Sequence, residues 1–196
     1  MAIVRRPKVD PVRCIEHLFQ HGIRLVEITM DTANAVEVLE YFRSGVPANC
    51  LLGAGTVTDV ELAEAALGAG ASFVVTPNIN LDVIRTVRAQ GIPVMPGALT
   101  PTEIWMASKA GADFVKVFPA SAFGPRYFRE IRGPFPWIPL VASGGVSLEN
   151  AAEFIKFGVD ALGLGGGLIP KSNDEFEQCA DLAHKLLEVA LKAREP

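Results

Sequence analysis

The run Gly111-Ala-Asp-Phe-Val-Lys-Val117 is the clearest guide to the architecture of this chain, because similar runs recur along it. In each copy a glycine is followed, after one to three residues, by a short apolar, β-branched or aromatic segment. The other copies begin at Gly22, Gly70, Gly91 and Gly158. Each glycine suits the left-handed position that ends a helix before the chain turns into a strand. Three further apolar runs, at residues 2–5, 50–54 and 138–142, lack this glycine and bring the predicted strands to eight.

The predicted strands begin 20 to 26 residues apart. This is the length of a compact unit of one strand and one helix, since strands of about 5 residues and helices of about 11 leave only short connections. Between the strands, capping residues predict helix starts at Thr58, Asn80, Thr100 and Ser147. Eight such units predict a parallel α/β fold, a compact (β/α)₈ TIM barrel with short loops, as a single domain over residues 1–196.

An open doubly wound sheet is the alternative architecture. Its dinucleotide-binding fingerprint would be G-x-G-x-x-G, followed about 20 residues later by an acidic residue. The glycine-rich runs at residues 53–55 and 163–167 lack that spacing. The pattern therefore favours the closed barrel.

The composition excludes several functional classes. The 196 residues are 49% hydrophobic and 20% charged, with a formal net charge of −4, which excludes intrinsic disorder and leaves no basic surplus for nucleic acid or an anionic membrane. The apolar runs are far shorter than the roughly 20 residues that span a bilayer, and the first residues lack the apolar core of a secretory signal. We therefore expect a cytoplasmic protein. Cys14, Cys50 and Cys179 are odd in number and far apart, which indicates reduced thiols rather than a disulfide framework or a zinc site.

Two charged residues interrupt strands that are otherwise suited to burial. Glu27 lies in Leu25-Val-Glu-Ile-Thr29, the second predicted strand, and Lys116 lies in the sixth. An unpaired charge in an apolar interior costs several kcal/mol, so structure alone rarely supplies a reason for it. A buried structural ion pair is the alternative to a functional pair.

Topology brings these two residues together. Catalytic groups of such barrels lie at the carboxyl ends of the strands, and strands two and six face each other across the barrel. Glu27 and Lys116 are therefore expected to face one small cavity. Burial lowers the pKa of a lysine, and the neutral amine is a nucleophile toward carbonyl carbon, as a Schiff base requires. A nearby carboxylate could move the protons of the reaction, a contribution of about 10²–10⁴-fold.

The loops after strands seven and eight predict an anion site. Such loops commonly bind phosphate in these barrels, and glycines leave backbone N–H groups unobstructed. The candidate residues are Ser143, Gly144, Gly145, Gly165 and Gly166. Plain turns are the alternative reading of both loops.

Several motifs, in this order and spacing, resemble a known family. They are Val26-Glu-Ile-Thr29, Gly53-Ala-Gly-Thr-Val57, Thr76-Pro77, Met95-Pro-Gly97, Thr100-Pro-Thr-Glu103, Lys116-Val-Phe-Pro-Ala120, Gly133-Pro-Phe135 and Ser143-Gly-Gly-Val146. Through nearly the whole chain the sequence is similar to the aldolases of 2-keto-3-deoxy-6-phosphogluconate (KDPG) and 4-hydroxy-2-oxoglutarate (KHG). These are class I pyruvate lyases that form a Schiff base.

The resemblance implies roles for individual residues. Lys116 would be the Schiff-base lysine and Glu27 the general acid and base, which agrees with the argument from burial and topology. Thr56 would help hold the pyruvyl part of the substrate, and Phe118 would pack against it. Arg5 matches an arginine of some relatives and could meet a carboxylate or phosphate, although a plain surface cation is the alternative.

The resemblance also concerns two turns, the partners and the cofactors. Thr76 with Pro77, and Pro96 with Gly97, are either strand-ending turns or places where the backbone approaches the substrate. The expected partners are a small 2-keto acid substrate and further copies of the chain in a homotrimer, with no cofactor and no metal. The histidines, His17, His21 and His184, lie away from the predicted strand ends, which agrees with the expectation of no metal site. The spacing of four residues between His17 and His21 is explained by a solvated helix face.

Two positions depart from the family pattern. Asp31 replaces the arginine that would clamp the pyruvate carboxylate, so Arg5 or backbone donors are expected to take that role. Gly166 stands where some relatives have a phosphate-binding serine, which removes one hydroxyl donor and leaves the amides.

The leading hypothesis is an aldolase that cleaves KDPG to pyruvate and glyceraldehyde 3-phosphate, or KHG to pyruvate and glyoxylate. Within the same family the galactonate epimer of KDPG is an alternative substrate. Two other hypotheses remain open. In one, a phosphate-binding barrel isomerase or epimerase uses Glu27 as its base and Lys116 only as an electrostatic clamp. In the other, the chain is a non-catalytic sugar-acid binding protein.

Overall fold

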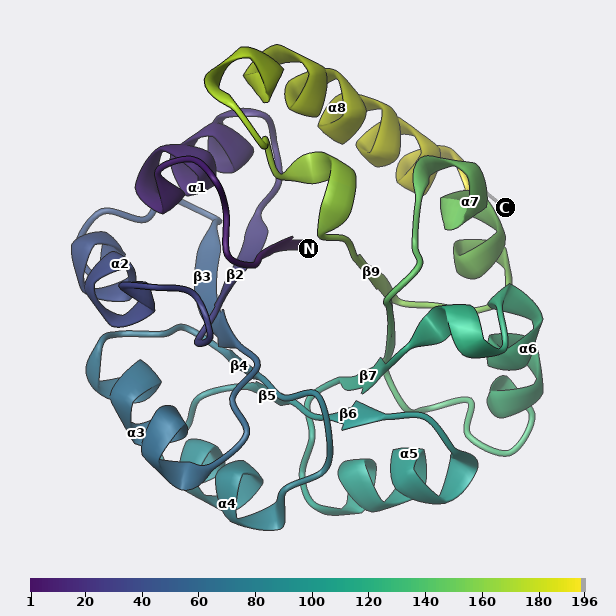
Figure 1. Cartoon of the computed structure of the whole chain (residues 1–196). Coiled ribbons are helices and arrows are strands. Elements are labelled where there is room, and N and C mark those ends of the chain that lie inside the picture. Colours follow the sequence, from purple (N-terminus) through teal and green to yellow (C-terminus); the bar gives the residue numbers. More distant parts are fainter. Residues whose placement is uncertain (195–196) are drawn as a thin grey trace.

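The computed structural model describes residues 1–194, in which short parallel strands alternate with helices. Figure 1 shows the strands as an inner ring and the helices as an outer one. The strands are β1 (Ala2–Val4), β2 (Leu25–Thr29), β3 (Leu51–Gly55), β4 (Val74–Val75), β5 (Val94–Met95), β6 (Gly97–Ala98), β7 (Val115–Val117), β8 (Leu140–Ser143) and β9 (Ala161–Gly163). The helices are α1 (Pro11–Gln20), α2 (Ala35–Phe42), α3 (Val60–Gly68), α4 (Leu81–Ala89), α5 (Pro101–Lys109), α6 (Pro125–Arg132), α7 (Leu148–Lys156) and α8 (Phe176–Lys192). Short 3₁₀ helices are η1 (Ala120–Ala122), η2 (Gly166–Leu168) and η3 (Asn173–Glu175). None of the helices in residues 1–194 has the length and apolar character needed to cross a membrane.

The strands close into a barrel. Hydrogen-bonded ladders run from β1 to β5 and from β6 to β9. Pro96 separates β5 from β6 because it has no N–H to donate, yet its carbonyl accepts a hydrogen bond from Lys116 N at 2.9 Å. These two segments are therefore halves of the fifth barrel strand. At the other seam Ile3 N donates to Leu164 O at 2.7 Å, so the last strand pairs with the first. The predicted eight-stranded parallel barrel is confirmed.

The repeated glycines have the backbone conformation that the sequence predicts. Gly22, Gly70, Gly91, Gly111 and Gly158 all have φ between +70° and +97°. A side chain would strain the backbone in this region, so glycine marks each of these passages from helix to strand.

The helix starts are mostly as predicted. Asn80, Thr100 and Ser147 are the N-caps of α4, α5 and α7. The prediction that Thr58 begins α3 is wrong, because Asp59 is the N-cap and its carboxylate accepts from Leu62 N at 2.8 Å. A carboxylate also interacts favourably with the positive end of the helix dipole, which a threonine hydroxyl does not match.

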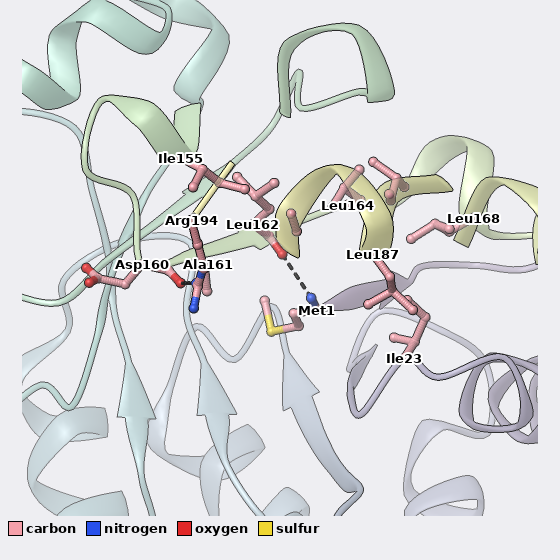
Figure 2. Close-up of a pocket in the computed structure, with 12 residues that line it drawn as sticks. Met1, Ile23, Ile155, Asp160, Ala161, Leu162, Leu164, Leu168, Leu187 and Arg194 are labelled. Atoms are coloured by element: carbon pink, nitrogen blue, oxygen red, sulfur yellow. Dashed lines mark hydrogen bonds between the residues drawn. The ribbon is translucent and has the colours of Figure 1, made fainter. Parts of the chain in front are cut away.

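The amino ends of the strands enclose mainly aliphatic side chains. A cavity of about 190 Å³ lies there, lined largely by leucines, isoleucines and alanines (Figure 2). The amino group of Met1 donates to Leu162 O at 2.9 Å across it. Two of the free cysteines, Cys14 and Cys179, are also buried, and burial raises the pKa of the Cys14 thiol to about 12. Neither of these regions has the character of a reactive site.

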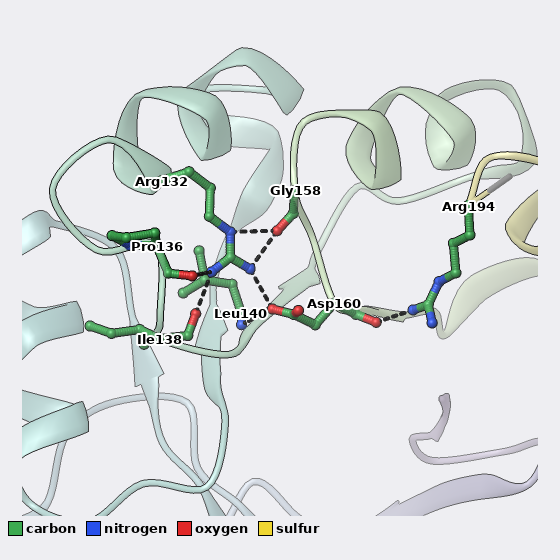
Figure 3. A network of polar contacts seen from close by, with 7 residues as sticks. All are labelled: Arg132, Pro136, Ile138, Leu140, Gly158, Asp160 and Arg194. Atoms are coloured by element: carbon green, nitrogen blue, oxygen red, sulfur yellow. Dashed lines mark hydrogen bonds and ion pairs between the residues drawn. The ribbon is translucent and has the colours of Figure 1, made fainter. Parts of the chain in front are cut away.

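Arg132 ties the end of α6 to the beginnings of β8 and β9 (Figure 3). Its Nε donates to Gly158 O at 2.7 Å and its Nη1 donates to Ile138 O at 2.6 Å. Its Nη2 pairs with the carboxylate of Asp160, which also accepts from Leu140 N at 2.7 Å. One planar guanidinium thus satisfies acceptors from two successive barrel units.

We expect Arg132→Lys to lower the free energy of unfolding by about 2 kcal/mol, because one ammonium cannot reach all these acceptors and leaves carbonyls unpaired. Urea denaturation measures the change. Arg129→Lys is the matched control, since the Arg129 side chain is exposed, pairs with the exposed Glu130 and lies over the Phe157 ring, contacts that a lysine can also make. It should change stability by no more than about 0.5 kcal/mol. Equal effects of the two substitutions would contradict the role given to Arg132.

Candidate active site

Glu27 on β2 and Lys116 on β7 meet inside the barrel. Glu27 is fully buried and Lys116 is 3% exposed. The Lys116 Nζ lies 4.0 Å from Glu27 Oε1, within ion-pair distance and beyond hydrogen-bond distance. Within residues 1–194 neither carboxylate oxygen of Glu27 has a hydrogen-bond partner. A buried carboxylate left in this way is costly to the fold, which favours a functional pair over a purely structural one.

The neighbouring strand makes room for the Glu27 carboxylate. Gly55 ends β3, which pairs with β2 in parallel register. A Cβ atom at Gly55 would lie 2.5 Å from Glu27 Oε1, closer than any side chain allows. The glycine is therefore part of what positions the acid, because only a residue without a side chain fits beside it.

Burial shifts both groups toward their neutral forms more strongly than each group's charge shifts the other toward its charged form. Burial raises the pKa of Glu27, and the positive charge of Lys116 only partly opposes this. Burial likewise lowers the pKa of Lys116, with the charge of Glu27 acting in the opposite direction. The pair can therefore exist as a neutral amine beside a carboxyl group, which are the forms that a nucleophile and a proton donor need.

For the keto-acid substrate that the resemblance implies, we expect kcat/KM to rise with pH and to level off below pH 10.5, the ordinary pKa of a lysine. The amine attacks only when neutral, and burial moves its deprotonation to lower pH. A pH profile measures the point where the rise ends. A rise that continued to pH 10.5 or beyond would show that the reacting lysine is not desolvated.

A cleft of about 730 Å³ opens at the carboxyl ends of the strands, above Lys116. It is lined by residues of β1, β7, β8 and β9 and of the segments that follow them. Eight of the residues predicted for the site line it: Arg5, Lys116, Phe118, Ser143, Gly144, Gly145, Gly165 and Gly166. The Phe118 ring centre lies 5.3 Å from Lys116 Nζ, so the ring forms one wall beside the amine.

The glycine loops offer backbone donors to this cleft. Gly144 and Gly145 have φ of +85° and +82°, and a Cβ atom at Gly145 would lie 2.5 Å from Ser121 Cβ. Ser121 N donates to Gly144 O at 3.0 Å, which anchors the loop through its carbonyl. Among the hydrogen bonds formed within residues 1–194, none uses the N–H of Gly144, Gly145, Gly165 or Gly166. These amides are available to an anion.

Four cationic residues besides Lys116 line the same cleft: Arg5, Arg6, Lys8 and Lys171. No acidic residue lies among the lining side chains in the described part of the chain. Arg6, Lys8 and Lys171 were not predicted from the sequence. Their positions in the sequence could have identified them as site residues, because they follow the first and last strands, at the end of the barrel where ligands bind.

Arg5 is held against the third strand. Its Nη2 donates to Thr56 Oγ1 at 2.8 Å. Thr56 has φ of +57°, which is rare for a β-branched residue and is more often found at functional sites. Thr56 does not line the cleft itself, but it directs the guanidinium that does.

Thr76, Pro96 and Gly97 lie in the wall of the barrel and not among the lining residues. Gly97 N donates to Thr76 Oγ1 at 3.4 Å, and the Thr76 hydroxyl donates to Asn78 O. Pro96 O accepts from the backbone N of Lys116. These residues support the strand that carries the lysine, and their contact with substrate stays a prediction.

Asp31 does not line the cleft, but it is paired with Arg6, which does. Its carboxylate lies 2.9 Å from Arg6 Nη2, and Arg6 Nε also donates to Asp31 O at 3.2 Å. Arg6 therefore offsets the negative charge at the position where the resemblance led us to expect an arginine. The cleft keeps its positive character although Asp31 stands where an arginine is usual.

The histidines lie on the outside of the barrel, between α1 and α8. His17 Nε2 is 2.8 Å from Phe176 O, and His21 Nδ1 is 3.3 Å from His184 Nε2. No group of three histidine, cysteine or acidic residues in the region 1–194 is arranged to hold a metal ion.

The comparison with known families decides between the hypotheses. A family model described as "Aldolase: KDPG and KHG aldolase" matches residues 1–183. The chain belongs to this family. It is therefore an aldolase, a carbon–carbon lyase, and the isomerase and non-catalytic alternatives lose their support.

Relatives of this KDPG/KHG family differ in their substrates. The 2-dehydro-3-deoxy-6-phosphogalactonate aldolase of Escherichia coli K12 is 38% identical over 179 residues, covering 89% of this chain and 87% of the relative. The 2-dehydro-3-deoxy-phosphogluconate aldolase of Treponema pallidum is 35% identical over 185 residues, covering 92% and 87%. The family thus leaves the choice between the two epimers open.

The solved structures agree with the fold. The structure described as native KDPGal is 33% identical, covers 98% of this chain and 94% of that chain, and superposes with a TM-score of 0.89. A cube-shaped, highly porous protein cage designed by fusing symmetric oligomeric domains is also 33% identical. It covers 98% of this chain and 72% of that chain, with a TM-score of 0.90.

Proposed function

We propose that this aldolase cleaves a 2-keto-3-deoxy-6-phospho sugar acid, KDPG or its galactonate epimer, to pyruvate and glyceraldehyde 3-phosphate. One observation carries the proposal. Lys116 lines a cleft that has cations and glycines but no acidic side chain of residues 1–194 in its lining, and the buried Glu27 lies 4.0 Å behind it. Such a cleft suits a substrate with an anionic group at each end.

The reaction follows from these two groups. The neutral amine of Lys116 attacks the C2 ketone, and loss of water gives an iminium ion. Glu27 takes the proton of the C4 hydroxyl as the C3–C4 bond breaks, and the bonding electrons move into the iminium to give the enamine of pyruvate. The C4 oxygen becomes the aldehyde of glyceraldehyde 3-phosphate. The enamine is then protonated at C3 and hydrolysed, which frees pyruvate and the lysine. Neither a cofactor nor a metal takes part.

The two ends of the substrate meet different residues. Arg5, fixed by Thr56, is close to the reacting lysine and takes the pyruvyl carboxylate in place of the arginine absent at position 31. The loops that contain Gly144 and Gly166, together with Lys171, bind the phosphate. Thr76, Pro96 and Gly97 are proposed to limit the space around the pyruvyl group.

Side-by-side kcat/KM values for KDPG, its galactonate epimer and KHG test the proposal. KHG is cleaved to pyruvate and glyoxylate and has no phosphate. We expect at least one phosphorylated substrate to exceed KHG by about 10²-fold, the value of two or so charge-assisted hydrogen bonds. A preference for KHG would mean that the cationic side of the cleft does not bind phosphate.

Gly166→Ser is expected to raise kcat/KM for the phosphorylated substrate about tenfold and to leave KHG unchanged. A Cβ at Gly166 has no atom within 4 Å, so the side chain fits and adds one hydroxyl donor to the phosphate loop. KHG is the control within the same variant, because it lacks the group that the serine would bind. A parallel gain for both substrates would place Gly166 away from the phosphate.

The chain is proposed to self-associate, as a single-domain subunit of a homotrimer. The support is the resemblance to its family and the protein cage described above, which was designed by fusing symmetric oligomeric domains. The cleft is built here within one chain, since every residue named for it belongs to the same barrel.

A further inference from the structure

The turn in which β2 ends lies beside the end of β1, where the chain reaches Arg5. The two strands pair in parallel, and the turn Thr29-Met-Asp-Thr32 is closed by a hydrogen bond from Thr32 N to Thr29 O at 2.8 Å. The hydroxyl groups of Thr29 and Thr32 lie 3.1 Å apart, and both threonines are buried. This turn is therefore a fixed point next to the cleft.

Both neighbours of Arg5 in the sequence are bonded to this turn. The Thr29 hydroxyl donates to Val4 O at 3.4 Å, and Arg6 N donates to Thr32 Oγ1 at 2.9 Å. Arg5 lies between these two bonds, and its own side chain lines the cleft. The backbone on each side of Arg5 is thus tied to the end of β2.

The Arg6 backbone has a conformation that needs support. Its φ is +42°, in the left-handed region that a residue with a side chain rarely adopts and keeps only where surrounding contacts hold it. Asp31 supplies two such contacts. Its carboxylate lies 2.9 Å from Arg6 Nη2, and its carbonyl oxygen accepts from Arg6 Nε at 3.2 Å. Asp31 therefore fixes the turn that directly follows Arg5.

We propose that Asp31 is a positioning residue, which holds the turn at Arg6 and thereby keeps the Arg5 guanidinium directed at the substrate carboxylate. This inference rests on the proposed function, which assigns that carboxylate to Arg5, and it gives a role to the acid found where an arginine was expected. Thr56 binds the tip of the Arg5 side chain and the turn fixes its base, so little freedom is lost when substrate binds.

The charge of Asp31 suits this role. Burial by itself raises the pKa of its carboxyl group, but the Thr29 hydroxyl and the positive charges of Arg5 and Arg6 lower the pKa by more. The carboxylate is therefore ionised at neutral pH, which is the form that pairs with a guanidinium.

Asp31→Asn tests the role through the pyruvate concentration that gives half-maximal borohydride trapping on Lys116. Pyruvate has the carboxylate of the substrate but no phosphate, so the readout concerns one end of the cleft. Asparagine keeps the shape of the side chain and loses the charge that holds Arg6. We expect the half-maximal concentration to rise about tenfold, and the maximal trapping rate to stay within about threefold of wild type, because Lys116 and Glu27 are unchanged.

The Arg5→Gln background separates positioning from a general loss of structure. Arg5→Gln should itself raise the half-maximal pyruvate concentration. Since Asp31 acts through Arg5, adding Asp31→Asn to this background should have no further effect. Asp82→Asn is the matched control, because Asp82 is an exposed aspartate of α4 that pairs with the exposed Arg85 outside the cleft. It should leave trapping unchanged.

The outcomes separate this inference from the proposed function. A half-maximal concentration that falls in Asp31→Asn would mean that the acid only repels the substrate carboxylate, and an unchanged one that it has no role; either overturns the inference. An equal increase in the Arg5→Gln background, or in Asp82→Asn, overturns it as well. In all these cases the wild type still forms the adduct, whereas a wild type that pyruvate does not trap would overturn the proposed function itself.

Discussion

Lys116→Met is expected to abolish covalent capture of pyruvate and to reduce keto-acid cleavage by at least about 10⁴-fold. The methionine has nearly the length of the lysine but no amine, so neither the iminium ion nor its electron-accepting role in C3–C4 cleavage can form. Borohydride reduction in the presence of pyruvate, followed by peptide mass spectrometry, should place an adduct on Lys116 of the wild type and none on the variant.

The fold should survive this change. Removing a buried amine also removes the cost of its burial, and Glu27 can stay protonated in its absence. The thermal midpoint is therefore expected to be at least that of the wild type. Lys156→Met, at an exposed lysine of α7, is the matched control and should keep both activity and the adduct. An adduct that persisted in the Lys116 variant would contradict the assignment of the nucleophile.

Glu27→Gln is expected to lower kcat by about 10²–10⁴-fold while pyruvate is still trapped on Lys116. Glutamine keeps the shape of the side chain beside Gly55, but it cannot take the C4 hydroxyl proton or return one to the enamine. The loss should therefore appear in the steps after the Schiff base has formed. Steady-state kinetics and the extent of borohydride trapping, measured on the same preparation, separate these steps.

Glu40→Gln, at an exposed acid of α2, is the control for loss of a carboxylate as such and should leave kcat unchanged. The pH profile gives a second readout. The negative charge of Glu27 raises the pKa of Lys116, so its removal should move the end of the rise in kcat/KM to lower pH. An unchanged kcat in Glu27→Gln would show that the proton passes through another group.

The architecture and the burial of Glu27 beside Lys116 were predictable from local patterns. The five glycines indicate left-handed turns, because few other residues adopt a positive φ without strain. Glu27 and Lys116 stand out since each is a charge within an apolar strand, and the barrel topology then places them face to face.

The cationic cleft was harder to predict. Lys8 and Lys171 are separated by most of the chain and lie in segments without periodicity, so only closure between β1 and β9 brings them together. The partner of Asp31 was equally hidden, because the pairing with Arg6 depends on the loop after β1 folding back toward the end of β2. The N-cap of α3 is one residue later than predicted. The side-chain oxygen that accepts from the first turn of the helix belongs to Asp59 and not to its neighbour Thr58.

The separation of charge in this molecule affects how fast substrate arrives and products leave, as well as how tightly they bind. The chain as a whole carries a net charge of −4, while its cleft presents arginine and lysine. A substrate anion is repelled weakly at long range and attracted at the entrance, and at 0.1 M salt the interactions beyond about 10 Å are largely screened. The products of the proposed cleavage, pyruvate and glyceraldehyde 3-phosphate, are themselves anions, so the field that would speed their precursor's arrival would also slow their departure. Turnover in such a site is governed by how readily its products escape as well as by how fast they are made.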